Sequence, residues 1–223
     1  MTNNPIGMGE QDRSERDKFE NELKRILQAS EDARNILRVI GSLAFQMHCP
    51  QFGYLQAAMG RAYTDIDFGA YSRQTKQITE MMIRLGYVEN REVFIASEGE
   101  RSIFDKADTG LHVDIFYEKL DFCHAIYWKD RLEVDSPTIP ITELLLEKMQ
   151  IVQINEKDVI DTIMLLLEHP FGDVDRETIN IKRAALSRQL AVENDLAQQV
   201  AQFLRRLMVV ARFDGVNQLV NPL

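Results

Sequence analysis

Two stretches of sequence decide the expected fold: TDIDF at residues 64–68 and LHVDIFY at residues 111–117. Both alternate polar and apolar residues, a pattern typical of β-strands that turn one face toward a core. Successive side chains in a strand point to opposite faces of the sheet, so Asp65 and Asp67 share a face and the apolar residues beside them enter the core. The first strand is therefore expected to present two carboxylates together.

The second strand carries an acid among apolar neighbours. Asp114 shares a face with His112 and Phe116, and an unpaired charge inside a sheet is costly. If the two strands are neighbours, three carboxylates converge, and hard oxygen ligands of this kind suit Mg²⁺ and a two-metal phosphoryl-transfer site. Simpler explanations are a solvated strand edge for the aspartate pair and a basic partner, Lys119 or Arg101, for Asp114.

A third element precedes these strands. Val39 and Ile40 predict a short buried strand, and Gly41-Ser42 leads into an expected helix. Glycine allows the backbone to approach a phosphate closely, and a helix N-terminus offers free N–H groups and a favourable dipole. The pair alone is a common turn, so it gains meaning only beside the carboxylates.

The remaining pattern indicates an α+β fold, a mixed sheet with flanking helices followed by a helical domain. Residues 1–13 are expected to be a flexible tail, 14–136 the domain with the sheet, and 137–223 the helical domain. The proline-containing segment 135–140 is the expected linker between the two domains. Helices are predicted at 14–38, 73–85 (closed by Gly86), 142–153, 157–168, 176–187 and 194–210; strands at 64–70, 87–96, 102–105, 111–117 and 128–134; and an irregular connection at 50–60.

Composition limits the class of function. The 223 residues have a formal net charge of −9, which disfavours a large basic groove for duplex DNA. Two cysteines without repeated spacing fit a reducing cytoplasm, and no apolar run approaches membrane-spanning length, so a cytoplasmic protein with no membrane partner is expected. The adjacent pairs His48-Cys49 and Cys123-His124 are too closely spaced to predict a zinc site.

Taken together, these motifs resemble the DNA polymerase β-like nucleotidyltransferase superfamily. The resemblance rests on Ile40-Gly41-Ser42, then Asp65-Ile66-Asp67-Phe68, then Asp114 in a further strand. The chain looks most similar to small prokaryotic AbiEii-type members, because Arg61 precedes the aspartate pair and the segments 145–150 and 155–161 follow in order. The resemblance covers roughly residues 39–168. The connection from Leu43 to Thr64 is longer than the family's, with the insertion expected within residues 48–60.

The resemblance implies a metal-dependent reaction. Asp65, Asp67 and Asp114 would be the catalytic residues and would hold two Mg²⁺ ions, with Asp114 as general base or second-metal ligand. Gly41, Ser42, Arg61 and Lys148 would bind the nucleotide. The implied reaction transfers a nucleoside monophosphate from a nucleoside triphosphate, such as ATP, to an unidentified hydroxyl on a small molecule, a protein or an RNA.

Lys148 is also notable without the resemblance. It lies three residues after Leu145 and four after Leu144, at the centre of an apolar helical stripe. It either extends its ammonium to solvent at the edge of an interface or contacts a triphosphate or an active-site carboxylate. Two alternatives to an enzyme stay open: a catalytically inactive nucleotide-binding or regulatory protein, and an interaction protein that assembles through residues 194–210. The sequence leaves the oligomeric state open.

Overall fold

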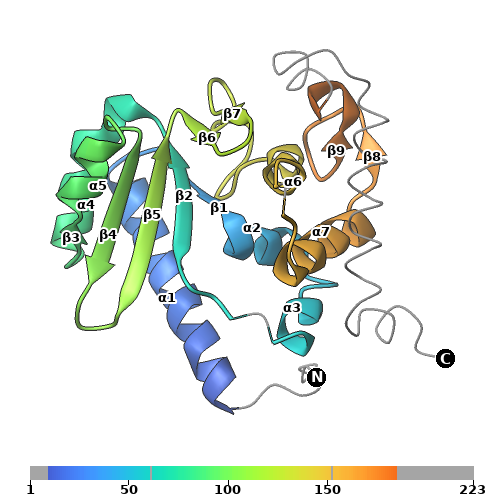
Figure 1. Ribbon diagram of the computed structural model, residues 1–223, viewed down its shortest axis with the longest axis horizontal. Helices are drawn as coiled ribbons and strands as arrows, with labels where there is room; N and C mark the ends of the chain where they lie inside the picture. The colour runs from blue at the N-terminus through green and yellow to red at the C-terminus, as the bar shows by residue number, and fades with distance from the viewer. Residues whose placement is uncertain (1–9, 61, 152, 185–223) are drawn as a thin grey trace.

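The computed structural model describes residues 10–60, 62–151 and 153–184. Its centre is a mixed five-stranded sheet in the order β1-β2-β5-β4-β3 (Figure 1). The strands are β1 Leu37–Ile40, β2 Ile66–Ala70, β5 Leu111–Tyr117, β4 Arg101–Lys106 and β3 Val88–Glu89. Within this sheet, β2 and β5 pair in parallel and the other three neighbouring pairs are antiparallel. The chain is therefore an α+β protein, as expected from the sequence.

The alternating pattern gives the two central strands their buried face. Ile66, Phe68, Val113 and Ile115 are fully buried, and they occupy the side of the sheet opposite the aspartates. Parallel neighbours need a crossover connection, which residues 71–110 provide. This segment contains the 3₁₀ turn η1 (Ser72–Gln74), helix α4 (Thr75–Arg84), β3, helix α5 (Arg91–Ala96) and β4.

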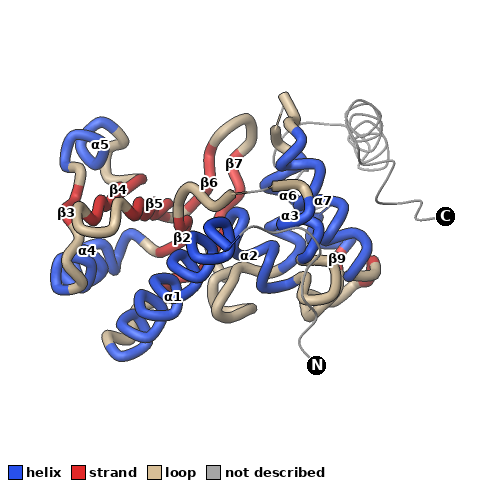
Figure 2. The backbone as a smooth tube through the Cα atoms, turned by 90° about the horizontal axis from the view of Figure 1, so that it is seen from below, coloured by secondary structure: helices blue, strands red, loops and turns tan. Residues whose placement is uncertain are grey.

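Two helices cover the buried face. α1 (Glu10–Asp32) and α4 lie on the same side of the sheet (Figure 2). α1 contributes Phe19, Leu23 and Ile26 to the core, at helical spacings of three and four. α4 ends where predicted, because Gly86 adopts a left-handed backbone with φ +90° just beyond it.

A second helical layer lies beside the sheet. It consists of α2 (Gly41–His48), α3 (Tyr54–Ala58), α6 (Ile141–Met149) and α7 (Glu156–Glu168), with α2 in contact with both α6 and α7 (Figure 1). α7 begins with a capping box in which the side chains of Asn155 and Asp158 each accept a backbone N–H of the other residue. Two short strand pairs complete the described chain: β6 (Lys119–Asp121) with β7 (Ala125–Tyr127), and β8 (Phe171–Gly172) with β9 (Ile179–Asn180).

The segment expected to be a linker runs along the edge of the sheet. Val39 N–H donates to the Pro137 carbonyl at 2.9 Å, and Ile139 N–H donates to the Val39 carbonyl at 3.2 Å. The Ser136–Pro137 peptide bond is cis. A single cluster of buried apolar residues extends from α1 and the sheet into α6 and α7. The second helical layer is thus packed directly against the edge of the sheet.

Several predicted elements are wrong. Residues 87–96 form the two-residue β3 and then α5, because the Asn90 side chain accepts the Val93 N–H at 3.3 Å and begins a helix there. Residues 129–136 form turns rather than a strand, and Trp128 is buried with its indole N–H donating to the Phe116 carbonyl at 3.2 Å. In residues 87–96 the β-branched and aromatic content was the misleading signal.

The ends of the described chain also differ from expectation. Helix α1 already includes residues 10–13, which were expected to belong to the tail. In place of a helix from residue 176, the chain forms β9, and helical residues begin at 181. The end of that expected helix and the whole segment 194–210 lie outside the described residues. Among the helices that the structure describes, none has the length and apolarity needed to span a membrane.

Candidate functional site

Asp67 and Asp114 are direct neighbours across the parallel strands β2 and β5. The register pairs these two residues, so their side chains leave the same face of the sheet. Asp65 lies one residue before β2, and it extends the alternation that places it with Asp67. The structure therefore places Asp67 and Asp114 on one face of the sheet, with Asp65 just before β2 and close enough for its charge to raise the pKa of Asp67.

The cluster is electrostatically unbalanced. Burial raises the pKa of Asp67 well above its ordinary value, and the charges of Asp65, Asp114 and Glu147 raise it further. Neighbouring carboxylates that cannot all ionise freely are a common property of sites that bind cations. The protein at this point favours a bound proton or a bound cation.

Arg101 on β4 is the basic partner of Asp114. Its Nε lies 2.9 and 3.0 Å from the two carboxylate oxygens, and its Nη2 donates to one of them as well. The guanidinium also stacks over the Phe116 ring, 5.1 Å from the ring centre. The hydrogen bonds from Arg101 to Asp114 raise the pKa of the guanidinium. Lys119, the other partner considered, pairs instead with Glu100 and Asp121.

Gly41 is required where β1 turns into α2. Its φ of +64° lies in the left-handed region, and a Cβ at this position would approach Asp67 Oδ2 to 2.5 Å. Ser42 follows in the first turn of α2 and is buried. The backbone of the Gly-Ser turn is thus in close contact with Asp67.

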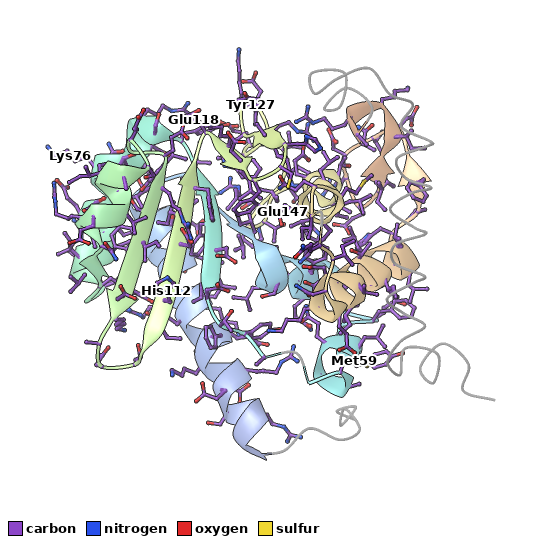
Figure 3. All side chains as sticks on the ribbon, in the orientation of Figure 1. Met59, Lys76, His112, Glu118, Tyr127 and Glu147 are labelled. Atoms are coloured by element: carbon purple, nitrogen blue, oxygen red, sulfur yellow. The ribbon has the colours of Figure 1, made fainter. Side chains whose placement is uncertain are left out.

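A fourth carboxylate faces this turn, and the sequence analysis missed it. Glu147 of α6 accepts the Gly41 N–H at 3.3 Å through Oε2, while its Oε1 is buried with no hydrogen-bond partner. Burial raises the pKa of Glu147 to about 8. Figure 3 shows this side chain in the interior, where α6 faces the sheet. Its only signal in the sequence is weak: Glu147 lies three residues after Leu144, on a helix that also carries Glu143 and Lys148.

Lys148 is buried and neutralises a different pair of acids. Its ammonium lies 3.0 Å from Asp158 and 2.9 Å from Asp161, both on α7, and 5.1 Å from the centre of the Phe45 ring. Its charge still lowers the pKa of Asp67, as the smallest of the five influences on that group. Lys148 therefore joins α6 to α7 in this structure, next to the site. Arg61 lies outside the described residues.

The expected insertion within residues 48–60 contains α3, which packs against α7. Gln56 is fully buried and donates to Asp161 at 2.8 Å and to the Ser42 carbonyl at 3.3 Å. The segment thus supports the start of α2 and connects it to α7.

The three aspartates are neighbours without yet forming a closed set of ligands. Among the described residues, one group of three possible metal ligands has all its ligand atoms within 4.8 Å of one another. This group is His48, His169 and Glu177, and it contains none of the aspartates. Asp114 is turned to Arg101. Cation binding by all three aspartates would need its carboxylate to leave the guanidinium.

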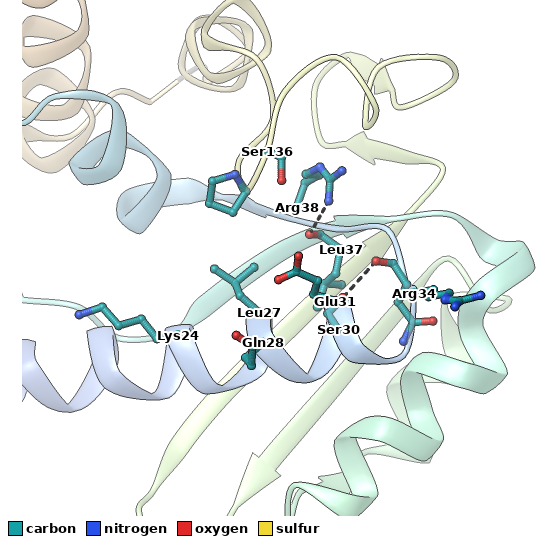
Figure 4. Close-up of a pocket in the computed structure, with 11 residues that line it drawn as sticks. Lys24, Leu27, Gln28, Ser30, Glu31, Arg34, Leu37, Arg38 and Ser136 are labelled. Atoms are coloured by element: carbon teal, nitrogen blue, oxygen red, sulfur yellow. Dashed lines mark hydrogen bonds between the residues drawn. The ribbon is translucent and has the colours of Figure 1, made fainter.

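A separate cavity of about 560 Å³ lies where α1 passes the edge of β1 (Figure 4). Its lining includes Lys24, Gln28, Arg34, Arg38 and Ser136. None of the three aspartates or of the Gly-Ser turn lines it. The cavity is therefore distinct from the carboxylate cluster.

Comparison with known proteins does not assign this chain to a family. The sequence matches no protein-family model, and a search of curated proteins gives no significant match.

Proposed function

We propose that the protein is a metal-dependent nucleotidyltransferase, which transfers a nucleoside monophosphate from a nucleoside triphosphate to a hydroxyl acceptor. The observation that supports this most directly is the placement of Asp67 beside Asp114, with the Gly41 backbone packed against Asp67. A glycine turn at a helix start and a set of acids on adjacent strands are the two parts that such chemistry needs.

The residues present fit a divalent cation. Asp67 is half-buried, and its pKa is raised by desolvation and by three neighbouring carboxylates, so a positive charge is the missing component of the cluster. Oxygen ligands from Asp65 and Asp67 are those that Mg²⁺ prefers, and Mg²⁺ would supply charge neutralisation for the triphosphate. The chain's own residues would hold the phosphates at the Gly41-Ser42 turn.

Two side chains must rearrange for the reaction. Glu147 accepts the hydrogen bond of the Gly41 N–H, which would otherwise be available to a phosphate oxygen. The Glu147 carboxylate must therefore withdraw or carry a proton when triphosphate binds. Asp114 must leave Arg101 before it accepts the proton of the attacking hydroxyl. The freed guanidinium would then be available to pair with phosphate oxygens at the aspartate cluster.

Binding measurements test the proposal. Titration of a non-hydrolysable triphosphate should show binding that requires Mg²⁺ and weakens at least about tenfold in Asp67→Asn, because a metal ligand is lost. Asp67→Asn should remain folded, since the carboxylate it removes is costly in its ionised form. Asp105→Asn is the matched control: Asp105 is an exposed acid on β4 that contacts His112 and lies outside the cluster. Triphosphate binding that ignores both Mg²⁺ and Asp67→Asn refutes the proposal.

The second candidate function is a nucleotide-binding protein without turnover. The bidentate contact between Arg101 and Asp114 favours it, because a guanidinium already neutralises the acid that catalysis would use. Pyrophosphate release separates the two candidates. Metal-dependent binding with release in the presence of cell extract supports the enzyme, and binding without release across all four triphosphates supports the second candidate.

A further inference from the structure

Three ligand-type side chains converge outside the aspartate cluster, at the far ends of two helices. His48 is the last residue of α2, His169 is the C-cap of α7, and Glu177 lies between β8 and β9 (Figure 1). One ring nitrogen of each histidine and one carboxylate oxygen of Glu177 all lie within 4.8 Å of one another. Segments separated by more than a hundred residues in sequence thus meet at one point.

The hydrogen bonds of His169 determine which nitrogen is available. Its Nε2 lies 2.8 Å from the His48 carbonyl oxygen, the shorter of the two carbonyl contacts of this ring, so in a neutral ring the proton is expected on Nε2. The lone pair of Nδ1 then faces two further acceptors of Glu177, the carbonyl oxygen at 3.4 Å and the carboxylate at 3.6 Å. A neutral ring has no second proton for them, so a cation at this point would satisfy all three atoms.

The ring of His48 is held in a comparable way. Its Nε2 lies 3.3 Å from the Ile139 carbonyl oxygen and 2.6 Å from Thr138 Oγ1. A proton on Nε2 serves the carbonyl and leaves the Nδ1 lone pair free. Histidines that bind metals usually donate their other N–H to a carbonyl or carboxylate in this manner, which fixes the ring.

Burial and access also suit a metal. His48 and His169 are both buried, at 9% and 6% exposure, so a metal bound between them would be largely shielded from solvent. The Glu177 side chain is 65% exposed and provides a route from solvent. Asp135 lies 3.9 Å from His48 Nε2, on the side of the ring that the carbonyl occupies.

We propose that His48, His169 and Glu177 form a transition-metal site whose expected occupant is Zn²⁺. Two ligand atoms at about 2.0–2.1 Å from a tetrahedral Zn²⁺ lie about 3.3 Å apart, close to the 3.6 Å between His169 and Glu177. Two imidazoles and one carboxylate leave a fourth position for water. The site joins the loop between β8 and β9 to the ends of α2 and α7, so metal binding should stabilise the fold.

Titration with Co²⁺ tests the site directly, because tetrahedral Co²⁺ absorbs visible light strongly and reports its ligands. The full chain, without an affinity tag and stripped of metal with a chelator, should bind one Co²⁺, which Zn²⁺ then displaces. Zn²⁺ should also raise the Tm. Glu177→Gln should weaken Co²⁺ binding at least about tenfold. Because Glu177 is exposed, this variant should fold even if His48 and His169 variants do not.

Two control variants locate the metal. Replacing both remaining histidines, His112→Gln with His124→Gln, should leave the Co²⁺ spectrum and affinity unchanged. Asp67→Asn should do the same, which separates this site from the aspartate cluster. The proposal is overturned if the wild type gives no tetrahedral Co²⁺ spectrum, if Glu177→Gln binds as the wild type does, or if a control variant removes the spectrum. Its failure would leave the proposed function untouched, since that depends on Mg²⁺ at the aspartates.

Discussion

A glutamine in place of Glu147 should make the metal-free protein more stable at alkaline pH while leaving its stability near pH 5 almost unchanged. The Glu147 carboxyl is buried, keeps one oxygen without a partner, and receives only the Gly41 N–H. The charged groups around it are Lys148 and Glu143 on its own helix, Asp161 on α7 and Asp67 on β2. Glutamine keeps the shape and the acceptor oxygen but carries no charge.

The magnitude follows from the pKa of Glu147, about 8 in the folded protein against an ordinary 4.5. An acid whose pKa is raised by folding holds more protons in the folded state between these two values, so stability is present below 4.5 and falls as pH rises toward 8. Each pKa unit corresponds to about 1.4 kcal/mol. From pH 5 to pH 8 the wild type should lose about 3–4 kcal/mol that the Glu147→Gln variant keeps, since the group is already partly titrated at both ends of this range.

Urea unfolding at pH 5, 6, 7 and 8 in the presence of EDTA provides the measurement. The single tryptophan, Trp128, is fully buried and reports unfolding by its fluorescence. Comparing the two proteins at each pH cancels the titration of groups far from residue 147, whereas the pKa of Asp67 should be lower in the variant because the Glu147 charge is gone. Glu80→Gln, which removes an exposed acid from α4, should parallel the wild type at every pH. A constant difference between wild type and Glu147→Gln across this range would refute the reasoning.

Three further substitutions examine the site. Gly41→Ala should lower the Tm and weaken Mg²⁺-dependent triphosphate binding, because a Cβ there meets Asp67 at 2.5 Å on a backbone with φ +64°; thermal unfolding and titration check this. Lys148→Met should cost about 3–5 kcal/mol in urea unfolding, since it leaves Asp158 and Asp161 buried without their cation. Arg101→Gln should tighten Mn²⁺ binding several-fold by freeing Asp114, and unchanged affinity in a calorimetric titration would mean that the guanidinium does not compete with the metal.

The carboxylate pattern was predictable because strand periodicity is local. The alternation in residues 64–68 and 111–117 assigned the faces of Asp67 and Asp114 correctly, and the hydrogen-bonded strand β5 spans residues 111–117 as expected. The helix start at Gly41 and the helix end at Gly86 were also predictable, since both depend on backbone preferences of single residues. At Asn90, residues typical of strands follow a residue that can cap a helix. There the side-chain cap prevails, and the chain forms α5.

The interaction partners of the site residues could not be predicted from local sequence patterns. Arg101 was one of two possible partners for Asp114, and only the antiparallel pairing of β4 with β5 selects it. Lys148 was singled out as an unusual charge on an apolar helical stripe, and the structure shows it to be buried. Its pairing with two acids of α7 depends on how α6 and α7 pack.

The amino-acid sequence by itself determined the local elements, the face on which each strand carries its acids, and the glycine at the turn into α2. These properties depend on neighbouring residues along the chain and on backbone preferences. The tertiary structure alone decided that Glu147 meets Gly41 and that His48 meets His169 and Glu177, across separations of 106 residues for the first pair and 121 for the two histidines. Contacts between such distant segments depend on the packing of whole helices against the sheet, and no local pattern encodes that packing.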